Sequence, residues 1–385
     1  MKITKGHIIK SVSVLSATLM LGASAAHAQF PGTNGRFITT SIGGYISGTA
    51  IGTGVYTWKN DGTNPHQFTF PFVNTGLDTS ASFSPDGTKI AYIGEYVSGN
   101  GNVDVLVKNA DESGSVVRVT SNAANDVHPR WSPDGTKIVF TRENAGDSQV
   151  VVANSDGSGS EVAITNNGGG DGKHGVFTPD GTQIVFLRGI GSSIDIADST
   201  GTESNASTII NPADVVNNLD VSPDGATVVY DQQETASSAS IRTVAIGGGS
   251  PTVIVAASNN KNNVYPSYSP DGTKISYISQ SSSSSQSADE QLVVYTIAGS
   301  TSTNVISFTN ADGGSIYTAT WGTNNGNYTT NVGGDAFNTG LPDTGTKSKN
   351  PFNNVLPAIL AAGAVLLLGA FGFVWYKREF GRKNR

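Results

Sequence analysis

Short stretches of alternating polar and apolar residues follow one another along residues 77–308, separated by turns rich in glycine, proline, asparagine and aspartate. Residues 137–141 and 149–153 alternate in this way, and no segment between the two ends of the chain keeps a sustained apolar period of 3.6 residues. Alternation with a period of two is typical of β-strands that have one buried face. The pattern therefore predicts an all-β domain with few helices.

One turn motif recurs five times in this region, and its prolines are 48, 46, 44 and 47 residues apart. Proline presets φ, aspartate bonds nearby backbone and glycine accepts a positive φ, so the motif predicts a type I turn with a glycine bulge. Because the five aspartates hold the same place in a turn, we interpret them as structural rather than as paired catalytic carboxylates. The turn residues are Pro85, Asp86, Gly87, Pro133, Asp134, Gly135, Pro179, Asp180, Gly181, Pro223, Asp224, Gly225, Pro270, Asp271 and Gly272.

A period in the forties with only strands between turns is typical of propeller blades. In the second repeat we expect strands that end at Trp131 and cover 137–141, 149–153 and 161–165, which make one four-stranded antiparallel blade. The motif resembles the PD40 or TolB-like propeller repeats, relatives of the WD40 class, over about residues 77–308. Aromatic residues that recur between the turns are interpreted as packing between blades rather than as a sugar platform; they are Phe83, Trp131, Phe140, Phe177, Phe186, Tyr230 and Tyr268.

A sixth unit is present only in pieces at the two ends of the domain. The expected strands are residues 35–40, 55–59, 67–69 and 318–321, and residues 322–326 replace the proline turn. We expect these pieces to pair in one composite blade, because this closes the ring and leaves no open strand edge. Residues 327–330 compete with 36–40 for the second strand, and the sequence leaves that choice open. The predicted fold is a six-bladed β-propeller of four-stranded antiparallel blades over residues 29–330.

The N-terminus has the pattern of a secretory signal peptide. Three lysines precede an apolar stretch from about residue 12 to 25, and Ala26 and Ala28 form a small-residue cleavage site before Gln29. The apolar stretch is short for a membrane span, so a retained anchor is the weaker alternative. We expect residues 1–28 to be removed on export by the general secretion route.

At the C-terminus, residues 355–376 form an uncharged apolar stretch long enough to cross a membrane, and the basic tail 377–385 should stay cytoplasmic. A plain membrane helix explains this stretch without further assumptions. A glycolipid-anchor signal would end in the apolar stretch itself. Upstream, however, a pentapeptide resembles the LPxTG sorting signal of Gram-positive surface proteins: Leu341, Pro342, Asp343, Thr344 and Gly345.

This resemblance implies that a sortase cleaves after Thr344 and transfers its carbonyl to a peptidoglycan amine. Residues 331–354 would then be the linker through the cell wall. The protein would be a secreted, cell-wall-anchored surface protein that contacts the membrane only through residues 355–376 before sorting.

The charge and composition of the chain limit which partners and which chemistry it can have. Residues 29–344 carry 13 Lys+Arg and 29 Asp+Glu, a net charge of −16, which disfavours nucleic acid and anionic lipid surfaces. The chain has no cysteine, which excludes disulfides, thiolate metal sites and a cysteine nucleophile. No familiar catalytic motif is present. Loops at 109–114, 154–159 and 166–172 could hold calcium, although turn chemistry explains them equally; no other cofactor is expected.

One repeat position varies in residue type between the copies, with four types in five copies. It lies five residues before each motif proline and is occupied by Ser80, His128, His174, Asn218 and Tyr265. Arg130 and Asp220 stand three residues before their prolines. In TolB-like propellers, the loops that lead into the first strands surround one mouth of the central channel, so the resemblance implies that these residues form a ring there. Binding sites commonly lie on such loops. The alternative is a set of solvated turn residues of varied type.

We therefore predict a non-enzymatic binding module for a protein, a peptide or a neutral glycan. A glycan lyase or hydrolase is the main alternative, and it would need acid and base groups from His128, His174, Arg130 and Asp220. A largely structural component of the wall is the third interpretation.

Overall fold

The computed structural model describes residues 34–323 except 43–44, 47–48, 51–53, 64, 69–79, 97–100, 145, 167–171, 190–192, 202–204, 213, 259, 282–289 and 310–314. The chain divides into two compact units, 1–335 and 336–385, and all described residues belong to the first. The predicted signal peptide, linker, sorting signal, apolar span, basic tail and competing strand at 327–330 lie outside the described residues. Within the described part, no helix is long and apolar enough to cross a membrane.

Every regular element of the described residues is a β-strand, as the alternating pattern predicts. Three four-stranded antiparallel sheets follow one another along the chain. The first contains β6 (Ala81–Phe83), β7 (Lys89–Gly94), β8 (Asp104–Asn109) and β9 (Val117–Arg118); the second β10 (Asn125–Trp131), β11 (Lys137–Asn144), β12 (Asp147–Asn154) and β13 (Val162–Ala163); the third β14 (Gly172–Phe177), β15 (Gln183–Arg188), β16 (Ser193–Asp198) and β17 (Ser207–Ile210).

The remaining strands form a composite sheet and a ten-stranded sheet. The composite sheet has the order β26-β1-β4-β5, with β26 (Ser315–Thr323), β1 (Asn34–Ile42), β4 (Gly54–Trp58) and β5 (His66–Gln67). The ten-stranded sheet contains β18 (Val216–Val221), β19 (Thr227–Thr235), β20 (Ser238–Ala245), β21 (Thr252–Val255), β22 (Lys261–Tyr268), β23 (Lys274–Ser281), β24 (Glu290–Thr296), β25 (Thr301–Thr309), β2 (Tyr45–Ile46) and β3 (Thr49–Ala50).

The fold is an all-β propeller, but its sheets differ from the prediction of six separate four-stranded blades. Four sheets are separate, and the other ten strands belong to one sheet. Within that sheet, two antiparallel sets, β18–β21 and β22–β25, are joined by a single parallel residue pair, Ala239 with Asn262. The side chain of Asn263 also donates a hydrogen bond to the Ala239 carbonyl at 3.1 Å. These contacts merge the two sets, and sequence periodicity contains no signal for them.

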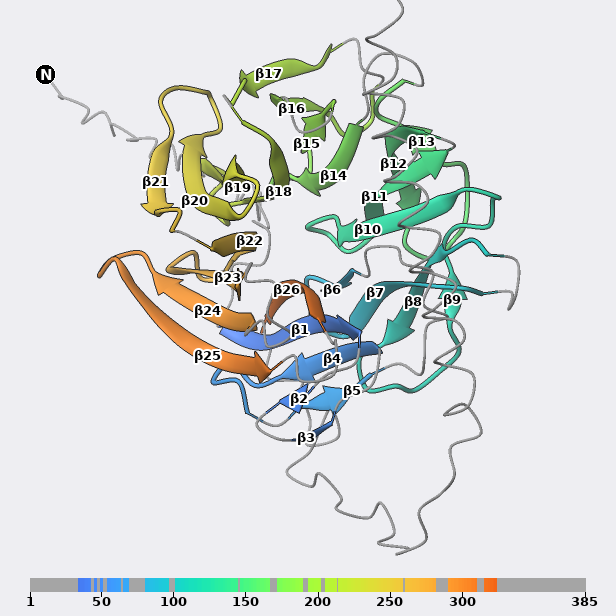
Figure 1. The fold of residues 1–385 in the computed structure, drawn as a ribbon. Helices are drawn as coiled ribbons and strands as arrows, with labels where there is room; N and C mark the ends of the chain where they lie inside the picture. Colours follow the sequence, from blue (N-terminus) through green and yellow to red (C-terminus); the bar gives the residue numbers. More distant parts are fainter. Residues whose placement is uncertain are drawn as a thin grey trace, which may run out of the picture. The chain divides into compact units, whose positions relative to one another are not determined.

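Figure 1 shows the sheets following one another around a common centre. The strands nearest the centre contact one another in a closed order: β6 with β10, β10 with β14, β14 with β18, β18 with β22, β22 with β26, and β26 with β6. Two small cavities lie among these inner strands, and we call the region that contains them the central channel.

The composite sheet joins the two ends of the domain, as the sequence predicts. Strand β1 pairs antiparallel with β26, placing Phe37 opposite Trp321 with ring centroids 4.1 Å apart. Gly322 stands where the repeated motif has serine or threonine, and a Cβ there would lie 2.4 Å from the Phe83 ring. Asn34 replaces the missing turn contact, since its amide donates a hydrogen bond to the Asp271 carboxylate at 2.9 Å.

The five motif turns line one face of the propeller, which we call the turn face. In the second turn, Asp134 Oδ1 accepts hydrogen bonds from Ser132 Oγ at 2.6 Å and from the Thr136 backbone N–H at 2.9 Å. The other motif aspartates make the same two contacts. Gly135 has φ +71°, and a Cβ there would lie 3.6 Å from the Pro85 ring of the preceding turn. Consecutive motif turns therefore lie next to one another.

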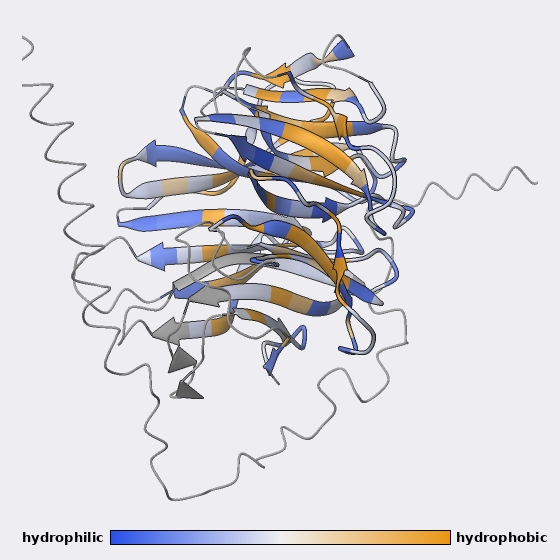
Figure 2. Cartoon of the chain, turned by 90° about the vertical axis from the view of Figure 1, so that its right-hand side faces the viewer, coloured by the Kyte–Doolittle hydropathy of each residue, from blue (hydrophilic) through white to orange (hydrophobic). Residues whose placement is uncertain are grey.

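The core lies between adjacent sheets. One cluster packs Val105 and Val107 of β8 against Trp131, Ile138 and Phe140 of the next sheet. In Figure 2, hydrophobic stretches lie in the middle of the strands and hydrophilic ones toward the loops. All seven aromatic residues predicted to pack are buried, with Tyr268 the most exposed at 8%; this confirms their interpretation as core.

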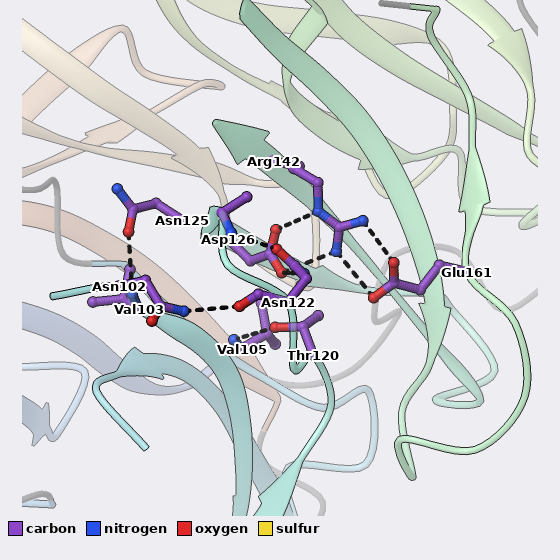
Figure 3. A network of polar contacts seen from close by, with 10 residues as sticks. Asn102, Val103, Val105, Thr120, Asn122, Asn125, Asp126, Arg142 and Glu161 are labelled. Atoms are coloured by element: carbon purple, nitrogen blue, oxygen red, sulfur yellow. Dashed lines mark hydrogen bonds and ion pairs between the residues drawn. The ribbon is translucent and has the colours of Figure 1, made fainter. Parts of the chain in front are cut away.

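A polar network fixes the crossing from the first four-stranded sheet to the second (Figure 3). The carboxylate of Asp126, which is fully buried, accepts hydrogen bonds from Arg142 at 2.8 and 3.0 Å and from Asn122 at 2.7 Å. Arg142 also contacts Glu161 at 2.6 and 3.0 Å. Burial lowers the pKa of Arg142, but its hydrogen bonds to Glu161 and Asp126 outweigh burial and raise the pKa above its usual value.

Candidate binding site in the central channel

All five residues of the varied repeat position line one cavity in the central channel, which we call the mouth cavity: Ser80, His128, His174, Asn218 and Tyr265. Each of the six inner strands contributes at least one residue to its lining. The cavity volume is about 30 Å³, enough for one or two water molecules. The structure thus brings together the residues that the sequence analysis groups.

Their local structure differs from the prediction of loops that lead into the first strands. Only Ser80 precedes its strand, whereas the other four lie within β10, β14, β18 and β22. In each of these strands the register with the next strand gains one extra residue at this position, which is a β-bulge. The bulge lets the chain remain hydrogen-bonded while a side chain turns toward the channel.

The bulges hold three side chains in an unfavourable backbone region. His128, His174 and Tyr265 have φ of +54°, +54° and +55°, in the left-handed region that costs a residue with a Cβ roughly 1–2 kcal/mol. Such outliers persist where the surroundings hold them, and they concentrate at functional sites.

Side chains on neighbouring strands supply contacts that hold the bulges. Thr141 Oγ1, on β11, accepts a hydrogen bond from the His174 backbone N–H at 3.0 Å. The buried carboxylate of Asp231, at the equivalent place on β19, accepts from the Tyr265 backbone N–H at 3.1 Å and from the Asn218 side chain at 2.7 Å. Neither anchor is predicted from the sequence, although each directly follows the recurrent aromatic residue of its strand.

The two histidines lie against each other in the mouth cavity. Their ring centroids are 3.9 Å apart and the rings are tilted by 47°. Burial lowers the pKa of His174 well below its usual value, and the charges of His128, Lys173 and Arg130 add to this effect. His174 is therefore neutral at physiological pH and presents an aromatic face and ring nitrogens.

A second cavity of about 20 Å³, the inner cavity, lies along the same channel, and Arg130 lines both. Asp220 lines the inner cavity, and burial raises its pKa, although Arg130 and hydrogen bonds from Tyr268 and Ser267 oppose the rise. Burial lowers the pKa of Arg130, against the attraction of Asp220. Trp321 also lines the inner cavity, and the sequence pattern predicts it only as part of a strand.

The arrangement is suited to binding small polar groups. It combines a guanidinium, imidazole rings, hydroxyl groups and an indole in two small cavities. Among the described residues, no group of three histidine, aspartate or glutamate side chains could hold a metal ion. The calcium prediction for residues 109–114 and 154–159 remains a prediction, and residues 167–171 of the third loop lie outside the described part.

The family model described as the TolB β-propeller domain, PD40, matches residues 69–261. The chain belongs to this family. The matched segment covers β6 to β21 and the motif turns within them.

The chain is also similar to individual proteins, in sequence or in fold. Over 132 residues the chain is 26% identical to the protein named "Uncharacterized peptidase YuxL" of Bacillus subtilis, covering 33% of this chain and 20% of that protein. The chain thus spans about a fifth of the length of this curated relative. Among solved structures, TolB from Acinetobacter baumannii is 19% identical with a TM-score of 0.57, covering 76% of this chain and 68% of that one. A chain of a nidogen/laminin complex is 12% identical with a TM-score of 0.53, covering 74% and 98%. These structures share the fold.

Proposed function

We propose that this protein is a non-enzymatic binding module of the cell surface, and that its ligand is recognised at the mouth cavity. The observation that supports this most is the set of bulges that hold His128, His174 and Tyr265 at positive φ around one cavity. A fold needs no such strain at a repeat position that glycine could fill.

The same site gives little support to catalysis. Burial lowers the pKa of His174 well below its usual value, which makes its imidazole a weak base. The Asp220 carboxylate already accepts hydrogen bonds from Ser267 Oγ, the Tyr268 N–H and the Val221 N–H. A general base needs a proton within reach in an accessible site. A glycan or peptide that lies across the mouth cannot bring its glycosidic or peptide bond inside cavities that hold only one or two waters. The similarity to a protein named a peptidase covers only a fifth of that protein.

An array of glycans and peptides, probed with residues 29–340, tests the binding function. The double variant His128→Ala/His174→Ala should weaken binding of the ligands found on the array by about 10- to 100-fold, if each imidazole makes a buried hydrogen bond to the ligand. The matched control is Val162→Ala/Val253→Ala, two exposed positions on the outer strands β13 and β21. Normal binding by the histidine variant together with loss in the control would overturn the proposal.

Surface anchoring is the second part of the proposal, and it depends on Leu341 to Gly345 and the apolar span that follows. Thr344→Ala should leave the protein in the membrane fraction, whereas Thr344→Ser tests tolerance of the hydroxyl. If the wild-type protein extracted from cells still carries residues 355–376 by mass spectrometry, the plain membrane helix is right and sorting is wrong.

The third part concerns the ring. We propose that the ten-stranded sheet represents two blades, giving six, because its two antiparallel sets share one residue pair and its strands β18 and β22 each occupy one place in the closed order of inner strands. Deleting residues 29–76 removes three strands of the composite sheet and should cause aggregation or a much lower melting temperature. An unchanged cooperative melt would contradict ring closure.

A further inference from the structure

Three polar groups along the central channel have no hydrogen-bond partner among the described residues. The hydroxyl of Ser80 lines the mouth cavity, and the indole N–H of Trp321 belongs to a residue that lines the inner cavity. Both residues are almost completely buried, at 6% and 5% exposure. Between them, Arg130 lines both cavities and interacts with Asp220 through charge attraction, with no hydrogen bond to a described residue. A buried polar group that is left without a hydrogen-bond partner destabilises the folded protein.

The hydrogen bonds to the Asp220 carboxylate come from other donors. Oδ2 of Asp220 accepts from Ser267 Oγ at 3.0 Å and from the Tyr268 N–H at 2.8 Å, and Oδ1 accepts from the Val221 N–H at 3.0 Å. The channel therefore has an excess of donors and a cation without a hydrogen-bonded acceptor. A guanidinium with its planar fork of N–H groups matches a carboxylate in geometry and charge.

The size of the cavities limits how a carboxylate can arrive. Volumes of about 30 and 20 Å³ admit one or two waters each, so a pyranose ring that bears its carboxylate directly is too bulky. A carboxylate at the end of a slim chain fits better, such as a glutamate side chain or a peptide C-terminus. Binding one carboxylate also agrees with the net charge of −16 over residues 29–344, because that field repels a polyanion far more than a single charge.

We propose that the central channel binds a carboxylate group of a peptide ligand, with Arg130 as its cationic partner and the Ser80 hydroxyl and Trp321 indole as further donors. This inference rests on the proposed binding function, whose ligand class it specifies. The peptide lies across the mouth cavity beside His128 and His174, and its acidic end enters the channel.

Titration of ¹⁵N-labelled protein with sodium acetate tests the channel directly. We expect saturable shifts of the Arg130 Nε–H and Trp321 Nε1–H resonances in the wild type, and affinity weakened about tenfold or more in Arg130→Gln. The matched control is Arg242→Gln, which removes the same charge from a partly exposed arginine paired with Glu234. Arg130→Lys keeps the charge without the fork, and thermal melts check that each variant is folded. Absence of saturable shifts in the folded wild type would overturn the inference.

Paired ligands then identify the carrier of the carboxylate. Short peptides with glutamate or a free C-terminus should bind better than their glutamine or amide counterparts, and glucuronate should bind no better than glucose. Peptides that bind through the histidines without preferring the acid form would disprove the carboxylate site and leave the binding function intact. Acetate binding at Arg130 with no array ligand that needs the histidines would disprove the binding function instead. Binding of glucuronate but not of acidic peptides would overturn the peptide assignment.

Discussion

The two faces of this propeller use the same repeat in opposite ways. On the turn face, the five motif turns carry the same aspartate and glycine, the aspartates make the same hydrogen bonds, and within these turns only glycine has a positive φ. At the channel mouth, the varied repeat position carries four residue types in its five copies, and two histidines and a tyrosine have a positive φ there in place of glycine. The repeat thus removes strain where it builds the scaffold and keeps strain where side chains meet in the channel.

The difference separates scaffold from site. A repeated residue with a repeated contact is explained by the fold, since each blade needs the same turn. A varied residue in a strained and repeated backbone position is not explained by the fold, because glycine would serve there better. Substitutions on the two faces, and melting temperatures across pH, test this difference.

The largest loss of stability is expected from removing Asp126, a buried structural residue on the mouth side of the protein. Asp126→Ala leaves Arg142 without its buried partner and should lower the free energy of unfolding by about 3–5 kcal/mol. Glu161→Ala removes the more exposed partner of the same arginine and should cost less than about 1 kcal/mol. Chemical denaturation measures both, and equal losses would mean that the network in Figure 3 is not centred on Asp126.

On the turn face, Asp134→Ala should lower the free energy of unfolding by about 1–3 kcal/mol, because the Thr136 N–H and the Ser132 hydroxyl lose their acceptor. Asp134→Asn keeps an acceptor oxygen and should recover most of the loss. Neither variant should change ligand binding at the mouth. A binding defect in a fully folded Asp134→Ala protein would show that the two faces are coupled.

The sequence predicts the turn face almost completely and the channel only in outline. The motif specifies its own turn within eight residues, and the aromatic residues near it are buried as expected. The pairing of β1 with β26 is also predictable, because an unpaired edge is costly. The bulge is different: it depends on a hydrogen bond from His174 to Thr141 of the preceding sheet. Arg142 and Asp126 likewise find each other through the fold, and the bridge between Ala239 and Asn262 leaves no trace in the periodicity.

Acid should affect the two faces with opposite sign. Burial alone would raise the pKa of Asp134, but hydrogen bonds from Ser132 and Thr136 lower it. A depressed folded-state pKa stabilises the protein above the unfolded pKa of about 4, and this stabilisation is lost as the pH falls through the folded value. Asp134→Asn should therefore flatten the loss of stability below about pH 4.

Burial raises the pKa of Asp220, although Arg130 and its hydrogen bonds oppose the rise. Because the unfolded chain releases this proton first, the protein loses stability as the pH rises from about 4 through the folded-state pKa. Asp220→Asn should remove that decline. Melting temperatures across this pH range, compared between the two variants and the wild type, measure both slopes. If the two variants change the pH dependence of the melting temperature in the same direction, the pKa values of Asp134 and Asp220 are not shifted in opposite directions.

The smallest effect is the most direct test of strain at the mouth. At His128 and His174, φ is +54°, so alanine keeps the strained conformation whereas glycine adopts it freely; each glycine variant should be about 1 kcal/mol more stable than the matching alanine variant. Asn218 holds the same repeat position without a positive φ, and there the order should reverse, with glycine less stable by about 0.5–1 kcal/mol. Denaturant midpoints of the six variants measure these differences. If glycine and alanine rank alike at all three positions, the backbone at the mouth is not strained, and the bulges lose their value as a sign of a binding site.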